Sequence, residues 1–310
     1  MTDATVTMTM AVEKPSSLWR DVWLQFRMHK GANLALWVLG ALILFAVVGP
    51  WVWRVDPNDI PSGIDFVRGK NLGPSWAHPM GTDQLARDQM ARLMAGGRVS
   101  LSVGLVAMLV AIAVGGTVGV LAGYFRLVDG LLMRLTDLFL ALPLLPLLLL
   151  MMFLFGDTAR AAIGARLGVF MLIVLAIGLT SWMQAARIVR GEVLALKERE
   201  FILAARSIGT PNRRIITRHI LPNVLGPVMV SATLGVAAAI ITESVLSFLG
   251  VGFPSDFPTW GRLLNDAYPE MQLYPLRAFW PGMAISLTVL AVNYIGDGLR
   301  DALDPRIRGR

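Results

Sequence analysis

Residues 99–124 read VSLSVGLVAMLVAIAVGGTVGVLAGY and contain no Asp, Glu, Lys or Arg. About 20 helical residues cross the roughly 30 Å of hydrocarbon in a bilayer, so this run predicts a transmembrane helix. Lipid offers no partner for backbone N–H and C=O groups, and a helix satisfies them within the segment. The run is also too long, and too apolar on every face, to be a barrel strand. It therefore predicts an all-α membrane protein.

Five further runs share this character, so we expect six transmembrane helices. The predicted spans are residues 32–53, 99–124, 131–155, 167–183, 224–250 and 278–295. Overall composition agrees, because 55% of the residues are hydrophobic and only 16% are charged, against about 25% charged in soluble domains. The first run begins only after a polar segment and is not followed by a small-residue cleavage site, which favours a retained span over a secretory signal. The chain has no cysteine, which excludes disulfides and thiolate chemistry.

The distribution of basic residues predicts the orientation of the chain. An even number of spans leaves both termini on one side, and 18 of the 28 Lys and Arg residues fall in the segments on that side. Because cytoplasmic loops are enriched in Lys and Arg, we expect both termini in the cytoplasm. The net charge of +7 then reflects orientation rather than binding to nucleic acid. The expected domains are a cytoplasmic tail (1–31), the first span with its outer loop (32–98), a core domain (99–297) and a C-terminal tail (298–310).

Small residues and prolines within the spans predict how the helices pack. Gly115, Gly119 and Gly123 lie four residues apart and make a flat stripe that another helix can approach closely. The partner helix could belong to the same bundle or to a neighbouring subunit. Pro143 and Pro146 lie inside the third predicted span, where each removes a backbone donor and clashes with the preceding turn. We therefore expect a kink there, of the kind that can help line a pathway.

Glu243 is the one acid deep within an apolar run. A charge in mid-membrane costs about 2.5–3.5 kcal/mol on insertion scales, so this side chain should face protein or water. Three interpretations remain open, namely hydrogen bonding between helices, lining of a pathway, and proton relay. A relay is the least favoured of the three because no second acid or histidine accompanies Glu243 in another span.

The inner segment at residues 187–222 predicts a helical elbow outside the membrane. Its first helix carries one apolar stripe at i, i+3, i+4 and i+7 spacing, formed by Phe201, Ala204, Ala205 and Ile208. Gly209 is typical of the position with positive φ that ends a helix. An N-cap at Thr210 and Pro211 in the first turn predict the start of a second, basic helix. We expect that helix to end at Leu221–Pro222, before the fifth span.

An amphipathic elbow of this kind can lie on lipid or dock onto a cytoplasmic partner. Its position between two spans does not suit a DNA-binding helix-turn-helix. An enzyme is not favoured either, because His29, His78 and His219 are scattered and form no metal-ligand pair or nucleophile–base set. The segment 63–71 has the wrong spacing, and lacks the Ser or Thr, for a phosphate-binding loop.

The elbow resembles the EAA loop of permease subunits in bacterial ATP-binding cassette (ABC) importers. Residues 201–209 read FILAARSIG and residues 213–223 read RRIITRHILPN, whereas the family pattern is roughly Glu-Ala-Ala, three residues, Gly, then Ile-x-Leu-Pro. Leu203 stands at the Glu position of that pattern. Four other segments resemble the second, C-type permease of the dipeptide/oligopeptide/nickel group: GTDQLARD (81–88), LSFLGVG (246–252), PTWG (258–261) and GDGLRDALDP (296–305). In the first of these segments, Ala86 stands where those permeases usually have Gly.

This resemblance implies a type I, MetI-like permease with six transmembrane helices in the bacterial inner membrane. It implies a paralogous permease partner, two cytoplasmic ATPases that bind ATP and Mg, and a periplasmic or lipid-anchored solute-binding protein. No cofactor is expected in this chain. The implied ATPase-coupling residues are Glu200, Phe201, Ala204, Ala205, Arg206, Ile208, Gly209, Arg213 and Arg214.

Short peptides are the solute class that the resemblance favours. Nickel complexes, glutathione, opines and oligosaccharides remain open. A self-contained secondary transporter is the less favoured alternative, since one intramembrane acid and no clear inverted repeat are found.

Overall fold

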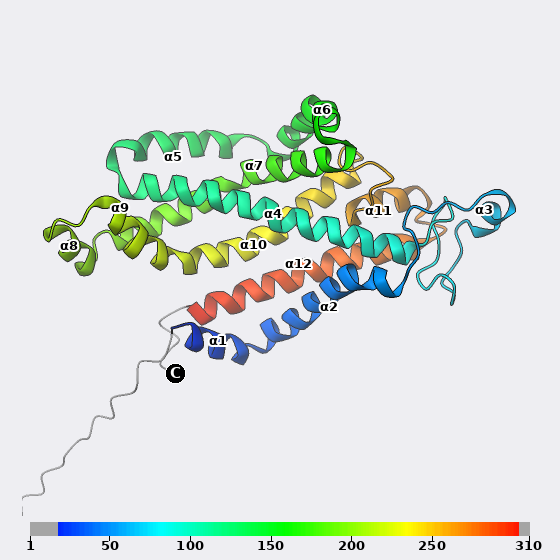
Figure 1. The fold of residues 1–310 in the computed structure, drawn as a ribbon, viewed down its shortest axis with the longest axis horizontal. Coiled ribbons are helices and arrows are strands. Elements are labelled where there is room, and N and C mark those ends of the chain that lie inside the picture. The colour runs from blue at the N-terminus through cyan, green and yellow to red at the C-terminus, as the bar shows by residue number, and fades with distance from the viewer. Residues whose placement is uncertain (1–17, 304–310) are drawn as a thin grey trace, which may run out of the picture.

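The computed structural model describes residues 18–303 and is helical throughout most of this range (Figure 1). Within it no strand forms beyond an isolated bridge between Thr82 and Asp88. The tail segments 1–17 and 304–310 lie outside the described residues. The helices are α1 (Leu18–Met28), α2 (Lys30–Val52), α3 (Gly63–Gly69), α4 (Gln89–Tyr124), α5 (Arg126–Ala141), α6 (Leu144–Ile163), α7 (Ala165–Leu196), α8 (Glu200–Ser207), α9 (Asn212–Ile215), η1 (Ile216–Ile220), α10 (Leu221–Phe248), α11 (Trp260–Ala267), η2 (Tyr268–Glu270) and α12 (Pro275–Leu303).

Six helical segments in the described range are long and apolar enough to cross a membrane, which confirms the predicted fold class. The segments contain α2, α4, α6, α7, α9 with α10, and α12. In Figure 1 the chain runs back and forth between two ends of the bundle. Helices α1, α8 and α9 lie at one end, and α3 and α11 lie at the other. The predicted elbow is therefore at the same end as α1 and the C-terminal end of α12.

The prediction that residues 131–155 form a single kinked helix is wrong. The structure divides it into α5 and α6, and Figure 1 shows α6 nearly end-on while α5 runs across the view. Leu142 has ψ 135 and Pro143 has ψ 113, so both leave the helical region. The Pro143 ring disfavours the helical conformation of the residue before it, and this breaks the helix instead of bending it. Pro146 lies in the first turn of α6, where no backbone donor is needed.

The predicted ends of two other spans are also wrong. Helix α4 begins at Gln89 rather than at residue 99, and the Asp88 side chain caps it by accepting from the Ala91 backbone N–H at 2.7 Å. Helix α7 continues to Leu196 instead of ending at residue 183. Hydropathy marks where a helix lies in lipid, but a helix extends as far as its backbone and packing allow. The first part of the predicted elbow segment therefore belongs to α7.

The sequence predicted that the second elbow helix ends at Leu221–Pro222, but the structure shows no end there. A single π turn, η1, joins α9 to α10, and the Leu221 backbone N–H donates to the carbonyl of Ile216, five residues back. A π turn is wider than an α turn, and it accommodates Pro222, which has no N–H to donate. The elbow is thus continuous with the fifth membrane helix.

Helix α4 packs against α7 along the predicted glycine stripe, so the stripe's partner lies within the same chain. A Cβ atom added at Gly115 would lie 2.4 Å from the Trp182 carbonyl oxygen, and one at Gly119 would lie 2.6 Å from that of Ala186. At Gly123 the added atom would meet the Val193 Cβ at 2.7 Å. Only glycine permits this approach between the two helices.

Arg98 supplies a hydrogen-bond donor that Pro50 lacks in the neighbouring helix α2. Pro50 lies inside α2 and cannot donate to the carbonyl of Ala46, four residues back. The Arg98 guanidinium of α4 donates to that carbonyl at 2.8 Å and to the Val47 carbonyl at 2.6 Å. An unsatisfied carbonyl is costly in lipid, so this arginine stabilises the proline-containing turn of α2.

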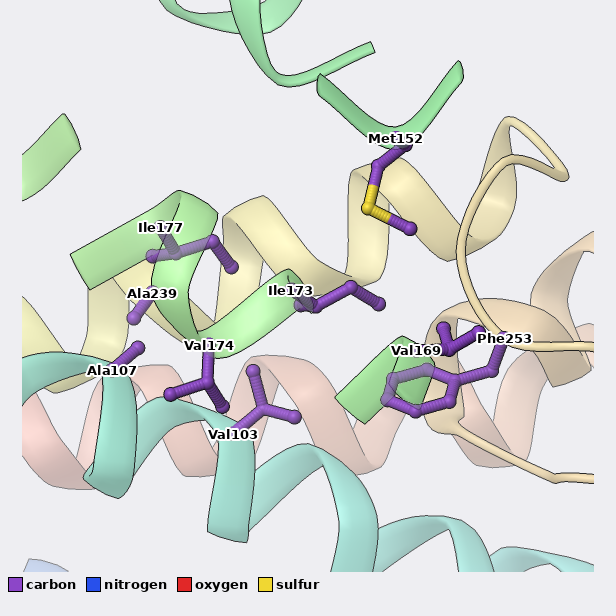
Figure 2. Packing of buried hydrophobic residues seen from close by; sticks show 9 residues of the cluster. All are labelled: Val103, Ala107, Met152, Val169, Ile173, Val174, Ile177, Ala239 and Phe253. Atoms are coloured by element: carbon purple, nitrogen blue, oxygen red, sulfur yellow. The ribbon is translucent and has the colours of Figure 1, made fainter. Parts of the chain in front are cut away.

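A hydrophobic cluster of buried residues lies where α4, α6, α7 and α10 meet (Figure 2). Figure 2 shows Phe253, from the segment after α10, packed beside Val169 of α7. The cluster consists of Val103, Ala107, Met152, Val169, Ile173, Val174, Ile177, Ala239 and Phe253. Each is at most 4% exposed, so this region is packed like the core of a soluble protein.

A buried ion cluster closes the opposite end of the bundle from the elbow. Asp83 accepts hydrogen bonds from the guanidinium groups of Arg87 (2.8 Å) and Arg92 (2.6 Å), and Arg92 also reaches Asp266 of α11 at 3.2 Å. Burial by itself raises the pKa of the Asp83 carboxyl, but Arg92 and Arg87 outweigh burial and hold that pKa below its ordinary value. The cluster ties the start of α4 to α11.

We predict different effects for alanine at two glycines of α4 that lie three residues apart, Gly116 and Gly119. Gly119→Ala should lower the melting temperature of the purified protein, because overpacking of this kind costs about 1–3 kcal/mol. Gly116→Ala is the matched control, since no atom lies within 4 Å of its added Cβ. It should leave the melting temperature unchanged or raise it, because alanine favours a helix over glycine. Equal melting temperatures for the two variants would contradict the close α4–α7 contact.

We predict a pH-dependent loss of stability for Asp83→Asn. Removing one partner of a buried pair costs about 3–5 kcal/mol. Because the folded pKa of Asp83 is lowered, its contribution is present above the ordinary value of 3.8 and is lost as the pH falls below it. Thermal unfolding should therefore separate wild type from Asp83→Asn at neutral pH, and the gap should narrow only in stronger acid. Asp157→Asn, at an exposed carboxylate, should have little effect at any pH. A pH-independent gap for Asp83→Asn would contradict the ionic origin of the effect.

Candidate functional site

The elbow at one end of the bundle begins where α7 ends. Lys197 follows α7 directly, and its buried ammonium donates to the carbonyl of Gly123 at 3.1 Å. Gly123 lies in the last turn of α4, where carbonyls lack partners within the helix and carry negative charge. This contact joins the ends of α4 and α7 and fixes the point from which the elbow leaves the bundle.

One face of α8 packs against the bundle. Ile202 is fully buried and Ala205 nearly so. Their cluster draws on α4, α7, α8, α9, η1 and α10, and consists of Val120, Tyr124, Val189, Val193, Ile202, Ala205, Ile215, Ile220 and Val224. Buried contacts of this kind hold α8 in a defined position relative to the membrane helices.

The other face of α8 is exposed and apolar. Phe201, Leu203, Ala204 and Ile208 are all exposed. The predicted stripe therefore divides between two environments, because Ala205 faces the bundle while the other three members point outward. Periodicity identifies residues on neighbouring parts of a helix, but the tertiary contacts of Ile202 decide which part is buried. On the outward face Phe201 lies beside the His219 ring, with 6.3 Å between the ring centroids, and it is still 46% exposed.

Gly209 ends α8 in the conformation that the sequence predicted. Its φ is +77, in the left-handed region, and no atom lies within 4 Å of an added Cβ. The Gly209 N–H donates to the Arg206 carbonyl at 2.9 Å, and the Thr210 N–H donates to the Ala205 carbonyl at 3.1 Å. These two bonds form a Schellman motif, which closes the helix with a tight turn. Any other residue would be strained at this φ, whatever the space around it.

The start of the second elbow helix differs from the prediction. Pro211, not Thr210, is the N-cap residue of α9, and it makes no side-chain cap hydrogen bond. The Tyr124 hydroxyl of α4 instead donates to the Asn212 side-chain oxygen at 2.7 Å. Arg206 lies over the same tyrosine ring at 5.3 Å, within range of a cation–π contact. Tyr124 thus contacts both helices of the elbow, a role that no sequence pattern had indicated.

The charged residues predicted for the elbow lie on its surface. Glu200, Arg206, Arg213 and Arg214 are all exposed. None forms an ion pair with another residue of the described range. The elbow therefore presents an apolar face and unpaired arginines at the same end of the bundle.

A cavity of about 880 Å³ opens among the membrane helices. Helices α4, α5, α6, α7, α10 and α12 all contribute to its wall. Leu142 and Leu144, on either side of Pro143, line it, so the break between α5 and α6 shapes the cavity. Its uncharged polar lining consists of Thr180, Ser181, Gln184, Ser231 and Thr242. Among the lining residues only Glu192 and Arg300 carry charge.

Glu243 does not line this cavity. Its carboxylate is fully buried and accepts hydrogen bonds from the hydroxyls of Ser100 (2.9 Å) and Ser247 (2.7 Å). The Ser100 oxygen in turn accepts the backbone N–H of Trp260 at 3.2 Å. Glu243 on α10 is thereby joined to α4 and to the first residue of α11. Of the three interpretations left open by the sequence, this geometry fits hydrogen bonding between helices best.

Sequence reasoning missed several residues of these sites. Lys197 and Tyr124, which hold the elbow, carry no local pattern that predicts their contacts. Gln184 and Ser231 lie in apolar runs, and a single polar residue there gives no indication of a shared cavity. Ser100 lies at the start of the apolar run 99–124, and its bond to Glu243 joins residues far apart in the chain.

Comparison with known proteins agrees with this architecture. Residues 115–309 match the family model "Binding-protein-dependent transport system inner membrane component", and residues 17–74 match "N-terminal TM domain of oligopeptide transport permease C". The chain is 36% identical to the oligopeptide transport system permease protein OppC of Bacillus subtilis, over 96% of this chain and 92% of OppC. It is 39% identical to the dipeptide permease protein DppC of the same organism, over 96% and 89%.

A third relative is the glutathione transport system permease protein GsiD of Escherichia coli, 38% identical over 97% of this chain and 95% of GsiD. These relatives are transport subunits, and ATP hydrolysis in such systems belongs to separate proteins. With six apolar helices, the chain is a multi-pass protein of the inner membrane. It belongs to the family of binding-protein-dependent transport system inner membrane components, as a permease subunit of an ABC importer with the type I, MetI-like fold.

Proposed function

We propose that this chain forms half of a translocation pathway for short peptides, next to a paralogous permease that forms the other half. Relatives named for oligopeptides, dipeptides and glutathione support this solute class, since glutathione is itself a tripeptide. Nickel complexes and other small solutes are the alternative. The observation that carries the transport role is the elbow, whose apolar outer face is exposed while its inner face is anchored in the bundle.

The cavity supports a peptide as the solute. Its volume of about 880 Å³ lies within the usual range for small-molecule sites, about 300–1,000 Å³. Hydroxyl and amide groups from Thr180, Gln184 and Ser231 can exchange hydrogen bonds with a peptide backbone. The remaining wall is largely apolar and would accept varied side chains without strong selection. A site of this chemistry suits a permease whose selectivity rests with a separate solute-binding protein.

The elbow supports coupling to two ATP-binding subunits, which would hold ATP and Mg. Phe201, Ala204 and Ile208 form an apolar face that a cleft in an ATPase can cover. Arg213 and Arg214 are exposed and unpaired in the described structure, so acidic groups of a partner can reach them. Rigid attachment through Ile202, Ala205 and the turn at Gly209 would carry movement of the ATPase into α7 and α10. Glu200 and Arg206 lie at the edge of the same surface.

The orientation follows from this assignment. With the elbow in the cytoplasm, both described ends of the chain are cytoplasmic, as the distribution of Lys and Arg predicts. The end with α3 and α11 then faces the periplasm, or the cell exterior, and receives the periplasmic or lipid-anchored solute-binding protein. The core domain 99–297, with the coupling segment 187–222, would perform transport, preceded by the first span with its outer loop.

We predict that Ile208→Asp uncouples the permease from its ATPases. Ile208 is 83% exposed, so a carboxylate there should not disturb folding, but it would place a charge in an apolar contact. Co-purification of the ATP-binding subunits should fall by at least about tenfold, and uptake should be lost.

Ile64→Asp is the matched control for this prediction. Ile64 lies on α3 at the opposite end and is 69% exposed. The same change there should leave co-purification of the ATPases intact. If Ile208→Asp retained its ATPases as well as Ile64→Asp, the proposed docking role of α8 would be wrong.

We predict that Glu243→Gln is tolerated better than Glu243→Ala. Glutamine retains the size of the side chain and can still form hydrogen bonds with Ser100 and Ser247. Alanine would leave these two buried hydroxyls unpaired and would create a void where the longer side chain had been. Glu243→Gln should keep most of the uptake, and Glu243→Ala should reduce the yield of folded protein in gel filtration. Complete loss of uptake in a folded Glu243→Gln protein would instead indicate a role that depends on the charge.

A further inference from the structure

Helix α1 is docked firmly on the bundle by one face. Val22 and Phe26 are buried against Ala32 of α2 and Ala302 of α12. A Cβ added at Gly298 of α12 would lie 3.3 Å from the Phe26 ring and 2.4 Å from the Ala32 Cβ. The absence of a side chain at Gly298 therefore lets all three helices meet. Helix α1 is a fixed element of the fold, although the sequence had assigned it to a polar tail.

The opposite face of α1 mixes large apolar and basic side chains. Arg20, Trp23, Leu24, Arg27 and Met28 recur at i, i+3, i+4, i+7 and i+8, and all are exposed. Met28 is 81% exposed and Trp23 is 53% exposed, with its ring stacked on Phe26 at 6.0 Å. We call these five residues the outer stripe of α1. Packing on the protein does not account for these apolar side chains.

The position of α1 in the fold restricts what can cover the outer stripe. Only His29 separates α1 from α2, a membrane helix. The His29 side chain accepts the backbone N–H of Ala32 at 3.0 Å and so caps α2 at the turn. Since α2 enters the hydrocarbon from this point, α1 is held at the boundary between the bilayer and water. This boundary is at the same end of the bundle as the elbow.

The chemistry of the outer stripe matches that boundary. Tryptophan concentrates where membrane meets water, and helices with a basic and apolar face lie in the headgroup region of anionic membranes. Arg20 and Arg27 make no ion pair with any acid whose side chain the structure describes, and both are exposed, so an external anion can reach them. Phospholipid phosphates lie at the depth where α2 leaves the bilayer.

We propose that α1 is an anionic-lipid-binding element that lies in the headgroup layer of the leaflet on the elbow side. Trp23, Leu24 and Met28 insert among the upper parts of the acyl chains. Arg20 and Arg27 bind phosphates of anionic phospholipids. The site is separate from the cavity and from the elbow, so it stands whether or not the proposed solute is correct.

The lack of cysteine allows a direct test of depth with the full-length permease. A nitroxide attached at Leu24→Cys in phosphatidylcholine–phosphatidylglycerol nanodiscs should be more accessible to oxygen, which partitions into lipid, than to an aqueous nickel complex. The same label at Ile208→Cys on the elbow should show the reverse order. Greater access of the nickel complex at Leu24→Cys would overturn the proposal. Protection of that label only after the ATP-binding subunits are added would also overturn it, because a protein would then cover the stripe.

A second measurement tests the role of charge. Native mass spectrometry should show that Arg20→Gln with Arg27→Gln lowers retention of phosphatidylglycerol on the order of tenfold. Arg213→Gln with Arg214→Gln is the matched control, because it removes two exposed arginines from the same end without touching α1. Equal retention of phosphatidylglycerol by the two double variants would overturn the proposed headgroup site. Gel filtration of both variants checks that each remains folded.

Discussion

Helix α4 packs against α7 through Gly115, Gly119 and Gly123. The positions of the elbow and of the ion cluster at the other end depend on this contact. Without side chains at these positions, the α4 backbone comes within van der Waals distance of α7. Helix α4 is 36 residues long and continuous, so it reaches from one end of the bundle to the other. Its first turns carry Arg92 of the outer ion cluster, and its last residues hold the elbow through Tyr124 and the Gly123 carbonyl. The two ends are therefore joined by one rigid pair of helices.

Polar groups within this bundle serve mainly to satisfy one another. Arg98 replaces the donor that Pro50 lacks, and Glu243 accepts from two serines rather than facing the cavity. Asp83 and Asp266 pair with Arg87 and Arg92, and in the proposed orientation this accounts for basic residues on the side where the charge rule expects few. The cavity retains uncharged groups, and its two charges, Glu192 and Arg300, lie toward the elbow end of their helices. This separation leaves the middle of the cavity without a fixed charge.

The elbow has the rigid attachment that the proposed coupling role requires. Ile202 and Ala205 anchor it, the turn at Gly209 fixes its angle, and the π turn after α9 makes it continuous with α10. The residues that anchor it are thus distinct from those that face outward.

Ala86 adopts an unfavourable backbone conformation, with φ +59, where permeases that this chain resembles usually have Gly. Holding a non-glycine residue in that region costs about 1–2 kcal/mol, so the contacts of the surrounding outer segment must compensate.

The sequence by itself determined the six membrane segments, the close-packing glycines, the helix-ending Gly209 and the amphipathic elbow. These features follow from local rules, namely hydropathy, residue size and backbone preference. Only the tertiary structure decided that the third span breaks at Pro143 and that Ala205 faces the bundle. It alone showed the partners of Glu243 and the docking of α1 on α12. The break at Pro143 is a local effect of the proline ring. Each of the other three depends on contacts between residues distant in the chain, and neither periodicity nor composition specifies which face meets which neighbour.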